Sequence, residues 1–195
     1  MIIAMMLIAA YLIGSIPTGL IIGKLFYNID IRQHGSGNLG ATNTFRILGK
    51  KAGIFVTIFD VLKGTISALF PVIFHQNIHP IIIGVVAVIG HVFPIYLKFK
   101  GGKAVATSAG VILGTNPVLF LIIAIIFFTL LFTTKMVSLT SMLTSIVNFI
   151  GSLFFEDKIL MGVSFLIMVV IIVRHKSNIE RIMNGTESKI NFNKK

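Results

Sequence analysis

The sequence predicts an all-helical membrane protein that crosses the bilayer several times, and two observations carry this prediction. Of its 195 residues, 55% are hydrophobic and only 12% are charged, whereas soluble domains average about 45–50% and about 25%. The apolar residues also gather in runs close to the length of about 20 residues that a helix needs to cross about 30 Å of hydrocarbon. We therefore expect lipid, and not water, to surround most of this chain.

Seven membrane helices are expected, and one of them is unusual. The long apolar runs are residues 3–26, 52–74, 78–97, 117–134, 136–155 and 158–174. A further run, 104–114, would be only about 16 Å long as a helix. It is either a short or partly re-entrant fourth helix or the first part of one bent helix over 104–134.

The basic residues decide between these two arrangements. With seven helices and the N-terminus outside, the inner segments 24–51, 98–103, 135 and the tail from 174 hold five, three, one and six lysines and arginines, which is 15 of the 17. One bent helix would move the six tail cations outside, against the positive-inside rule. The sequence therefore favours a single domain over 1–195 with seven helices, the N-terminus outside and the C-terminus in the cytoplasm.

Composition also excludes several kinds of function. The net charge of +11 is explained by membrane orientation and by attraction for anionic lipid or substrate, so no nucleic-acid partner is expected. The absence of cysteine excludes disulfides, thiolate metal sites and a cysteine nucleophile. The five histidines form no metal-ligand pattern, and we expect neither a metal nor another cofactor.

A polar, glycine-rich segment follows the first apolar run. It reads GSGNLGATN over residues 35–43 and is followed by Arg46. Glycines let N–H groups converge on an anion, and an arginine can hold a phosphate through two parallel hydrogen bonds. The segment matches GxGxxG, but a dinucleotide site needs a preceding strand. We interpret it as an anion-binding loop, with a flexible turn as the plainer alternative.

Two further polar segments lie on the same predicted face. Gly101-Gly102-Lys103 precedes a helical run, which would place free amides, the positive end of the helix dipole and an ammonium together. Lys98 and Lys100 beside it also fit a simple membrane anchor. The segment 174–181 carries His175 and Asn178, which share a face if the segment is helical, although a solvated tail is the plainer interpretation.

Two charged residues are expected inside the membrane. Asp60 and Lys63 lie near the middle of the run 52–74, where charges often mark a functional site. Because they are three residues apart, they can pair with each other. We therefore favour a buried structural ion pair.

Four segments taken in order resemble one family. They are residues 14–19 (GSIPTG), 35–46, 90–94 (GHVFP) with 101–103, and 175–185, whose final glycine opens the sequence Gly185-Thr186-Glu187. Together they resemble the bacterial acyl-phosphate:glycerol-3-phosphate acyltransferase family over essentially the whole chain. The resemblance implies a seven-helix enzyme of the bacterial cell membrane with its active site facing the cytoplasm. It would transfer an acyl group from acyl phosphate to the first hydroxyl of glycerol 3-phosphate, giving 1-acyl-glycerol 3-phosphate and phosphate, as a monomer in membrane lipid.

The resemblance also implies which residues form the site. Glycerol 3-phosphate would be surrounded by a catalytic set consisting of Ser36, Arg46, Lys103, His175 and Asn178. The acyl-phosphate group would be held by Thr42, Asn43 and neighbouring backbone amides, and the wider substrate-binding set adds Gly37, Asn38, Gly40, Gly101, Gly102 and Ser141.

Three points stay open at this level. The family uses a serine in the stretch 137–141, and Ser141 is favoured over Ser138. The general base is either His175 or the phosphate of the substrate. Ala104 stands where the family usually has a third glycine, which is costly only if that residue needs a positive φ.

Two other classes of function compete with the acyltransferase. A small transporter of a phosphorylated solute would place its site near the bilayer midplane on related repeats, whereas the candidate segments here lie on one interface and no repeat is visible. A non-catalytic lipid-binding subunit gives no reason for three anion-binding segments. We therefore favour the enzyme.

Overall fold

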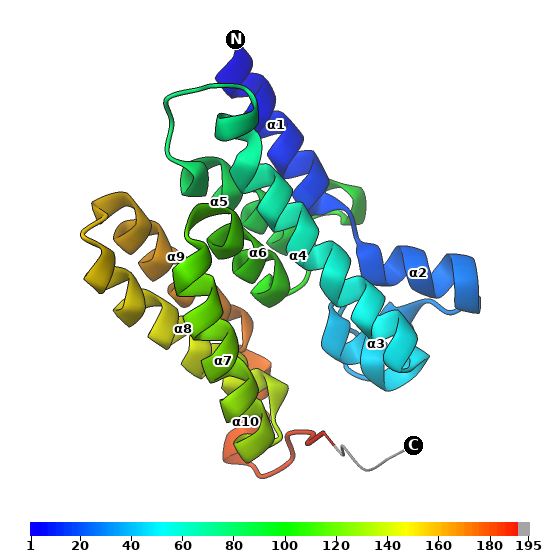
Figure 1. Cartoon of the computed structure of the whole chain (residues 1–195). Coiled ribbons are helices and arrows are strands. Elements are labelled where there is room, and N and C mark those ends of the chain that lie inside the picture. Colours follow the sequence, from blue (N-terminus) through cyan, green and yellow to red (C-terminus); the bar gives the residue numbers. More distant parts are fainter. Residues whose placement is uncertain (191–195) are drawn as a thin grey trace. The chain divides into compact units, whose positions relative to one another are not determined.

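The computed structural model describes residues 1–190, and the regular elements in that range are all helical, as expected (Figure 1). The α-helices are α1 (Ile2–Ser15), α2 (Thr18–Tyr27), α3 (Ala41–Leu48), α4 (Lys50–Ile73), α5 (Pro80–Val92), α6 (Val105–Thr115), α7 (Pro117–Thr134), α8 (Val137–Ser152), α9 (Lys158–Arg174) and α10 (Lys176–Met183). Short 3-10 turns are η1 (Ile31–Gln33), η2 (Ile95–Leu97) and η3 (Leu153–Phe155). Two of the tail cations, Lys194 and Lys195, lie outside the described residues.

Several of these helices are suited to a bilayer by length and composition. Within residues 1–190, four spans qualify directly, namely α4, Pro80–Leu97, α7 and Val137–Phe155. Two bent pairs, α1 with α2 and α9 with α10, raise the number to six if each pair is one span. α6 is apolar but only 11 residues long, which fits the short helix expected over 104–114. A count of seven spans and the side on which each terminus lies stay predictions.

The first apolar run is broken in the middle. α1 ends at Ser15, α2 begins at Thr18, and the two helices are bent by 45°. Pro17 causes the break because it has no N–H to donate and disfavours the helical conformation of Ile16 before it; Ile16 is extended, with φ −60° and ψ 116°. The expectation of one continuous helix over 3–26 was therefore wrong.

Polar caps start three of the later helices. The side chains of His79, Asn116 and Asp157 accept N–H groups of the first turns of α5, α7 and α9. Such caps accept the N–H groups of the first helical turn, which have no partner within the helix. A proline is favoured at the first position, as in α5 and α7, because it has no N–H to satisfy. Because Asn116 and Pro117 begin a new helix, residues 104–134 form two helices and not one continuous helix.

The chain divides into two compact units, Met1–Thr115 and Asn116–Lys195, while the expectation of a single domain stays a prediction. In the first unit, α4 packs along α5 and α6, and α1 packs against α5 (Figure 1). The α4–α6 contact is close, since a Cβ built on Gly64 would lie 2.1 Å from the carbonyl oxygen of Thr107. Small residues permit such approach between membrane helices.

The predicted intramembrane ion pair is present in this unit. Lys63 Nζ lies 2.8 Å from Asp60 Oδ1, and both side chains are at least nine-tenths buried. The pair therefore belongs to the interior of the helix packing, where a lone charge would be costly.

In the second unit, α8 packs against both α7 and α9. α7 is apolar on all sides and largely exposed, which suits a helix facing lipid. α8 differs because its buried face is polar; the buried residues are Ser138, Thr140, Ser141, Met142, Thr144, Ser145, Asn148 and Ser152.

Candidate active site

The glycine-rich loop before α3 is braced by a buried carboxamide. Asn43 Oδ1 accepts the N–H of Ser36 at 3.0 Å. Its Nδ2 donates to the carbonyl oxygens of Ile31 and His34 at 3.2 and 3.0 Å. The side chain of Asn43 is thus engaged by the backbone around it, and this geometry makes it a support of the loop.

Glycine and asparagine shape the entry into α3. Gly37 has φ +68°, a left-handed conformation that favours glycine. Asn38 Oδ1 accepts the N–H of Gly40 at 3.1 Å, and the carbonyl of Gly40 accepts both the N–H and the hydroxyl of Thr44. The first N–H groups of a helix have no intrahelical partners, so the start of α3 is a place where an anion can bind.

α3 presents a cation and a hydroxyl on one face. Thr42 and Arg46 are four residues apart and exposed, while Asn43, Thr44 and Leu48 are buried. Residues four apart on a helix are neighbours on its surface. Thr42 and Arg46 can therefore act on the same bound group, and Ser36 is exposed on the loop that precedes them.

An ion pair stabilises the chain just before this loop. Arg32 donates to both carboxylate oxygens of Asp30. This hydrogen bonding, with the charge of Arg32, holds the pKa of the Asp30 carboxyl well below its usual range. Asp30 also caps η1 by accepting the N–H of Arg32, so the turn that leads into the loop is fixed.

The Gly101-Gly102-Lys103 loop folds back against the end of α5. The N–H of Gly101 donates to the carbonyl of Val92 and that of Gly102 to the carbonyl of His91, both at 3.1 Å. A Cβ on Gly102 would lie 2.3 Å from His91 Nε2. The expectation that these two amides are free donors was therefore wrong, because the glycines serve the close packing of the loop. Lys103, half-buried at the start of α6, carries the charge.

Ala104 adopts the strained conformation. Its φ is +56° and it is buried beside the start of α6. A left-handed conformation costs a non-glycine residue about 1–2 kcal/mol. Alanine at this position is therefore unfavourable to the backbone, which answers the question that the sequence left open.

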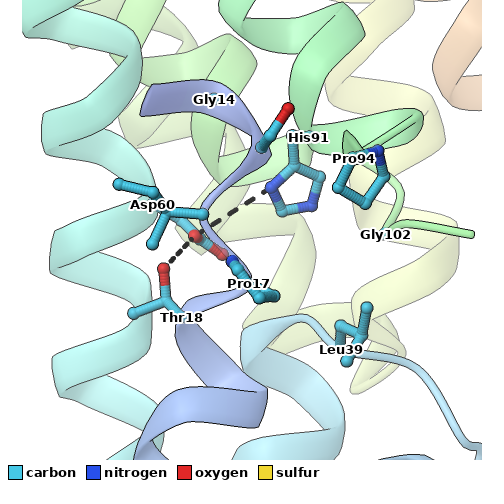
Figure 2. A pocket seen from close by; sticks show the side chains of 10 residues that line it. Gly14, Pro17, Thr18, Leu39, Asp60, His91, Pro94 and Gly102 are labelled. Atoms are coloured by element: carbon cyan, nitrogen blue, oxygen red, sulfur yellow. Dashed lines mark hydrogen bonds and ion pairs between the residues drawn. The ribbon is translucent and has the colours of Figure 1, made fainter. Parts of the chain in front are cut away.

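A small pocket lies between these two loops within the first unit. Its cavity volume is about 10 Å³ and its lining includes Leu39 of the glycine-rich loop and Gly102 of the second loop. Asp60 lies beside it, with Thr18 and His91 on either side (Figure 2). Thr18 Oγ1 donates to Asp60 Oδ1 at 3.0 Å, and His91 Nδ1 lies 4.0 Å from the same oxygen.

In the second unit, the predicted residues His175 and Asn178 lie where α9 meets α10. His175 is buried at the break between these helices, which are bent by 57°. Its Nδ1 is 2.7 Å from the carbonyl oxygen of Ile171, and since a carbonyl only accepts, Nδ1 carries the proton. Any exchange of a proton with substrate would then use Nε2.

A buried carboxylate gathers three donors beside α10. Ser138 Oγ and Asn178 Nδ2 donate to Glu187 Oε1 at 2.6 and 2.7 Å. Arg181 Nε donates to Glu187 Oε2 at 2.7 Å. Burial raises the pKa of Glu187, but these three hydrogen bonds and the charge of Arg181 outweigh it, so the pKa lies below its ordinary value. Glu187 is therefore held as an anion that organises its neighbours.

The two candidate serines of α8 differ in their partners. Ser138 contacts Glu187, whereas Ser141 Oγ donates to the carbonyl of Val137 at 2.7 Å. Both side chains are buried. The preference for Ser141 as the site serine stays a prediction.

The structure groups the predicted site residues by unit. The loop–helix segment 36–46 and the segment 101–103 belong to the first unit, while Ser141, His175 and Asn178 belong to the second. Sequence reasoning did not assign a role to Glu187 or His91, although both fall in the segments that carried the resemblance. An acidic residue two positions after Gly185, next to a basic segment, is the signal that could have indicated Glu187.

The fold and these loops define a class: an apolar, helical protein with two glycine-containing loops, one leading to Arg46 and the other to Lys103. The family profile described as glycerol-3-phosphate acyltransferase matches residues 4–185, and the chain belongs to this family. It is similar to glycerol-3-phosphate acyltransferases of Macrococcus caseolyticus (72% identity) and Bacillus cytotoxicus (58%), over 98% of this chain in both cases and 99% and 96% of theirs.

Two solved structures share the fold. The first is a crystal structure of PlsY (YgiH), an integral membrane glycerol 3-phosphate acyltransferase, in the glycerol 3-phosphate form, with a TM-score of 0.91. The second is its lysophosphatidic acid form, with a TM-score of 0.88. Both are 36% identical in sequence and cover 96% of this chain and 95% of theirs. The chain is thus a multi-pass integral membrane protein of the acyltransferase family.

Proposed function

We propose that this protein transfers an acyl group from acyl phosphate to the sn-1 hydroxyl of glycerol 3-phosphate. The products are 1-acyl-glycerol 3-phosphate and phosphate, and the reaction is the first acylation of phospholipid synthesis. The observation that carries the proposal is the pair of glycine-containing loops, one with Arg46 and one with Lys103, in a chain of this family. Two phosphate-bearing substrates call for two such loops.

The chemistry requires little from the protein beyond placement and charge. The hydroxyl oxygen attacks the acyl carbon, an ester C–O bond forms, and the C–O bond of the mixed anhydride breaks to release phosphate. Both substrates are anions that repel each other, so fixed cations and N–H donors supply most of the catalysis. In this proposal Ser36, Arg46 and Lys103 of the first unit bind glycerol 3-phosphate, and His175 and Asn178 are the substrate-binding residues of the second unit. Thr42 and the amides at the start of α3 hold the acyl phosphate.

The hydroxyl proton leaves to one of two bases. The phosphate of the substrate is the first, and His175 through Nε2 is the second, since its Nδ1 donates to the carbonyl of Ile171. We favour the phosphate and assign His175 to binding. Replacement of His175 should then raise KM more than it lowers kcat; a loss confined to kcat would assign the base to the histidine.

We further propose seven spans, with the N-terminus outside and the loops on the cytoplasmic face of the bacterial membrane. The distribution of lysine and arginine supports this orientation. A cysteine introduced at exposed Lys100 should then be labelled by a membrane-impermeant thiol reagent only from the cytoplasmic side; the chain has no other cysteine.

Phosphate release tests the proposed reaction. The purified protein in lipid receives palmitoyl phosphate and glycerol 3-phosphate, separately and together. Release that needs both substrates, yields 1-palmitoyl-glycerol 3-phosphate and is lost in Arg46→Ala and Lys103→Ala supports the proposal. Lys51→Ala, which removes an exposed cation outside the loops, is the matched control and should retain activity. If glycerol 3-phosphate were acylated with palmitoyl-coenzyme A but not with palmitoyl phosphate, the acyl donor would be different from the one proposed. If glycerol 3-phosphate entered vesicles without being acylated, the protein would be a transporter.

A further inference from the structure

We infer that Asp60 is a positioning residue that couples the two candidate phosphate loops of the first unit. The inference deepens the proposed function and rests on it. Asp60 lies on α4, away from both loops in sequence, and its side chain is buried. Its carboxylate contacts one group that leads to each loop, as Figure 2 shows.

The first contact leads to the glycine-rich loop. Asp60 Oδ1 accepts the hydroxyl of Thr18 at 3.0 Å, at the first position of α2. The next residue, Gly19, packs so closely on this loop that a Cβ there would lie 2.2 Å from the carbonyl oxygen of Leu39. The loop therefore rests on the start of α2, whose place depends on Asp60.

The second contact leads to the Gly101-Gly102-Lys103 loop. His91 Nδ1 lies 4.0 Å from Asp60 Oδ1 and 3.2 Å from Thr107 Oγ1. The opposite edge of the same imidazole packs on Gly102, and the carbonyl of His91 accepts the N–H of Gly102. The ring is thus held between the carboxylate and the loop.

The charge of Asp60 is balanced by the same network. Lys63 Nζ lies 2.8 Å from Asp60 Oδ1 and 3.3 Å from the carbonyl oxygen of Ile16, at the break between α1 and α2. A buried carboxylate with this many partners resists displacement, because moving it would leave charges or donors unpaired. The network is suited to fix the two loops relative to each other, and Asp60 can do this without touching substrate.

Threonine variants test the inference without removing a buried charge. Thr18→Val deletes the hydroxyl that donates to Asp60, and Thr107→Val deletes the hydroxyl beside His91. Each should raise KM for at least one substrate by roughly three- to ten-fold, with kcat changed by no more than about two-fold. The serine variants Thr18→Ser and Thr107→Ser keep the hydroxyl and should restore KM.

A matched control lies on the same pair of helices. Thr65 Oγ1 on α4 donates to the carbonyl of Gly110 on α6 at 2.9 Å, but it contacts neither loop. Thr65→Val should leave KM unchanged. Thr18 donates to Asp60, and Thr107 contacts the imidazole that faces the same carboxylate. If the two contacts are coupled through Asp60, the effect of the double variant Thr18→Val/Thr107→Val on KM should differ from the product of the two single effects. Unchanged KM in both single variants, or a simple product in the double variant, would overturn the inference.

Amide hydrogen exchange supplies a measurement that does not need activity. Exchange at Gly101 and Gly102 should accelerate in Thr107→Val and not in Thr65→Val, because their N–H groups donate to the carbonyls of Val92 and His91. A wild-type protein without acyltransferase activity would overturn the proposed function, while this exchange pattern would still support the positioning role. Equal exchange in wild type and Thr107→Val would count against that role whatever the activity.

Discussion

Asn178 Nδ2 donates a 2.7 Å hydrogen bond to Glu187 Oε1, which ties α10 to the segment that follows it. The chain turns back at Gly185, whose φ is +69°, and this turn brings the carboxylate beside the helix. Ser138 of α8 donates to the same oxygen. Glu187 therefore sets the position of Asn178, one of the predicted site residues.

The stability given by Glu187 should depend on pH. Its folded-state pKa is lowered, so its contribution is fully present above the unfolded-state pKa of about 4.3 and is lost as the pH falls from there through the lower folded-state pKa. Glu187→Gln should destabilise the protein by about 2 kcal/mol near pH 7, because charged hydrogen bonds to Arg181 and Asn178 are lost. Melting temperatures of the two proteins should approach each other as the pH is lowered from 7 toward the folded-state pKa of Glu187.

A glutamate on α10 itself provides the control. Glu180 is exposed, and Glu180→Gln should change the melting temperature little at any pH. A destabilisation by Glu187→Gln that stays constant down to pH 3.5 would show that the carboxylate charge is not what holds the cluster.

The sequence predicted the helices better than the contacts of its loops. Apolar runs and the i, i+3 spacing of Asp60 and Lys63 are local signals, and both the helical runs and the ion pair are present. The contact between Ser138 and Glu187 joins residues 49 positions apart, and no local pattern encodes it. The amides of Gly101 and Gly102 were expected to be free for a ligand because they precede a helix, but both donate to carbonyls at the end of α5.

Close packing at Gly102 makes it intolerant of a side chain. Gly102→Ala would place a methyl group 2.3 Å from His91 Nε2, so either the loop or the imidazole must move. We expect kcat/KM to fall by at least about ten-fold, since small displacements of binding groups carry large kinetic costs. Steady-state phosphate release measures this effect.

Gly162 in α9 is the matched glycine. A Cβ there meets nothing within 4 Å, and alanine is favoured over glycine inside a helix by about 1 kcal/mol. Gly162→Ala should therefore keep activity and raise the melting temperature. Equal activity in Gly102→Ala and Gly162→Ala would refute the packing role given to the loop glycine.

The carboxamide of Asn43 should not be replaceable by a carboxylate of the same shape. Asn43→Asp would set an oxygen against the carbonyls of Ile31 and His34, where the amide now donates two hydrogen bonds. Loss of both bonds at a buried position should destabilise the protein by about 2–4 kcal/mol. Asn77→Asp, at an exposed turn, should be nearly neutral, and thermal unfolding in lipid measures both.

Replacement of Ala104 by glycine should stabilise the protein. Relief of the left-handed conformation is worth about 1–2 kcal/mol, while loss of the buried methyl group costs about 0.8 kcal/mol. The net gain of about 0.5 kcal/mol should raise the melting temperature by about 1–2 °C. Ala109→Gly, inside α6, relieves no strain and should lower stability by about 1 kcal/mol. Opposite signs for the two variants therefore test the backbone conformation of Ala104; a drop in both would mean that the buried methyl group outweighs the strain.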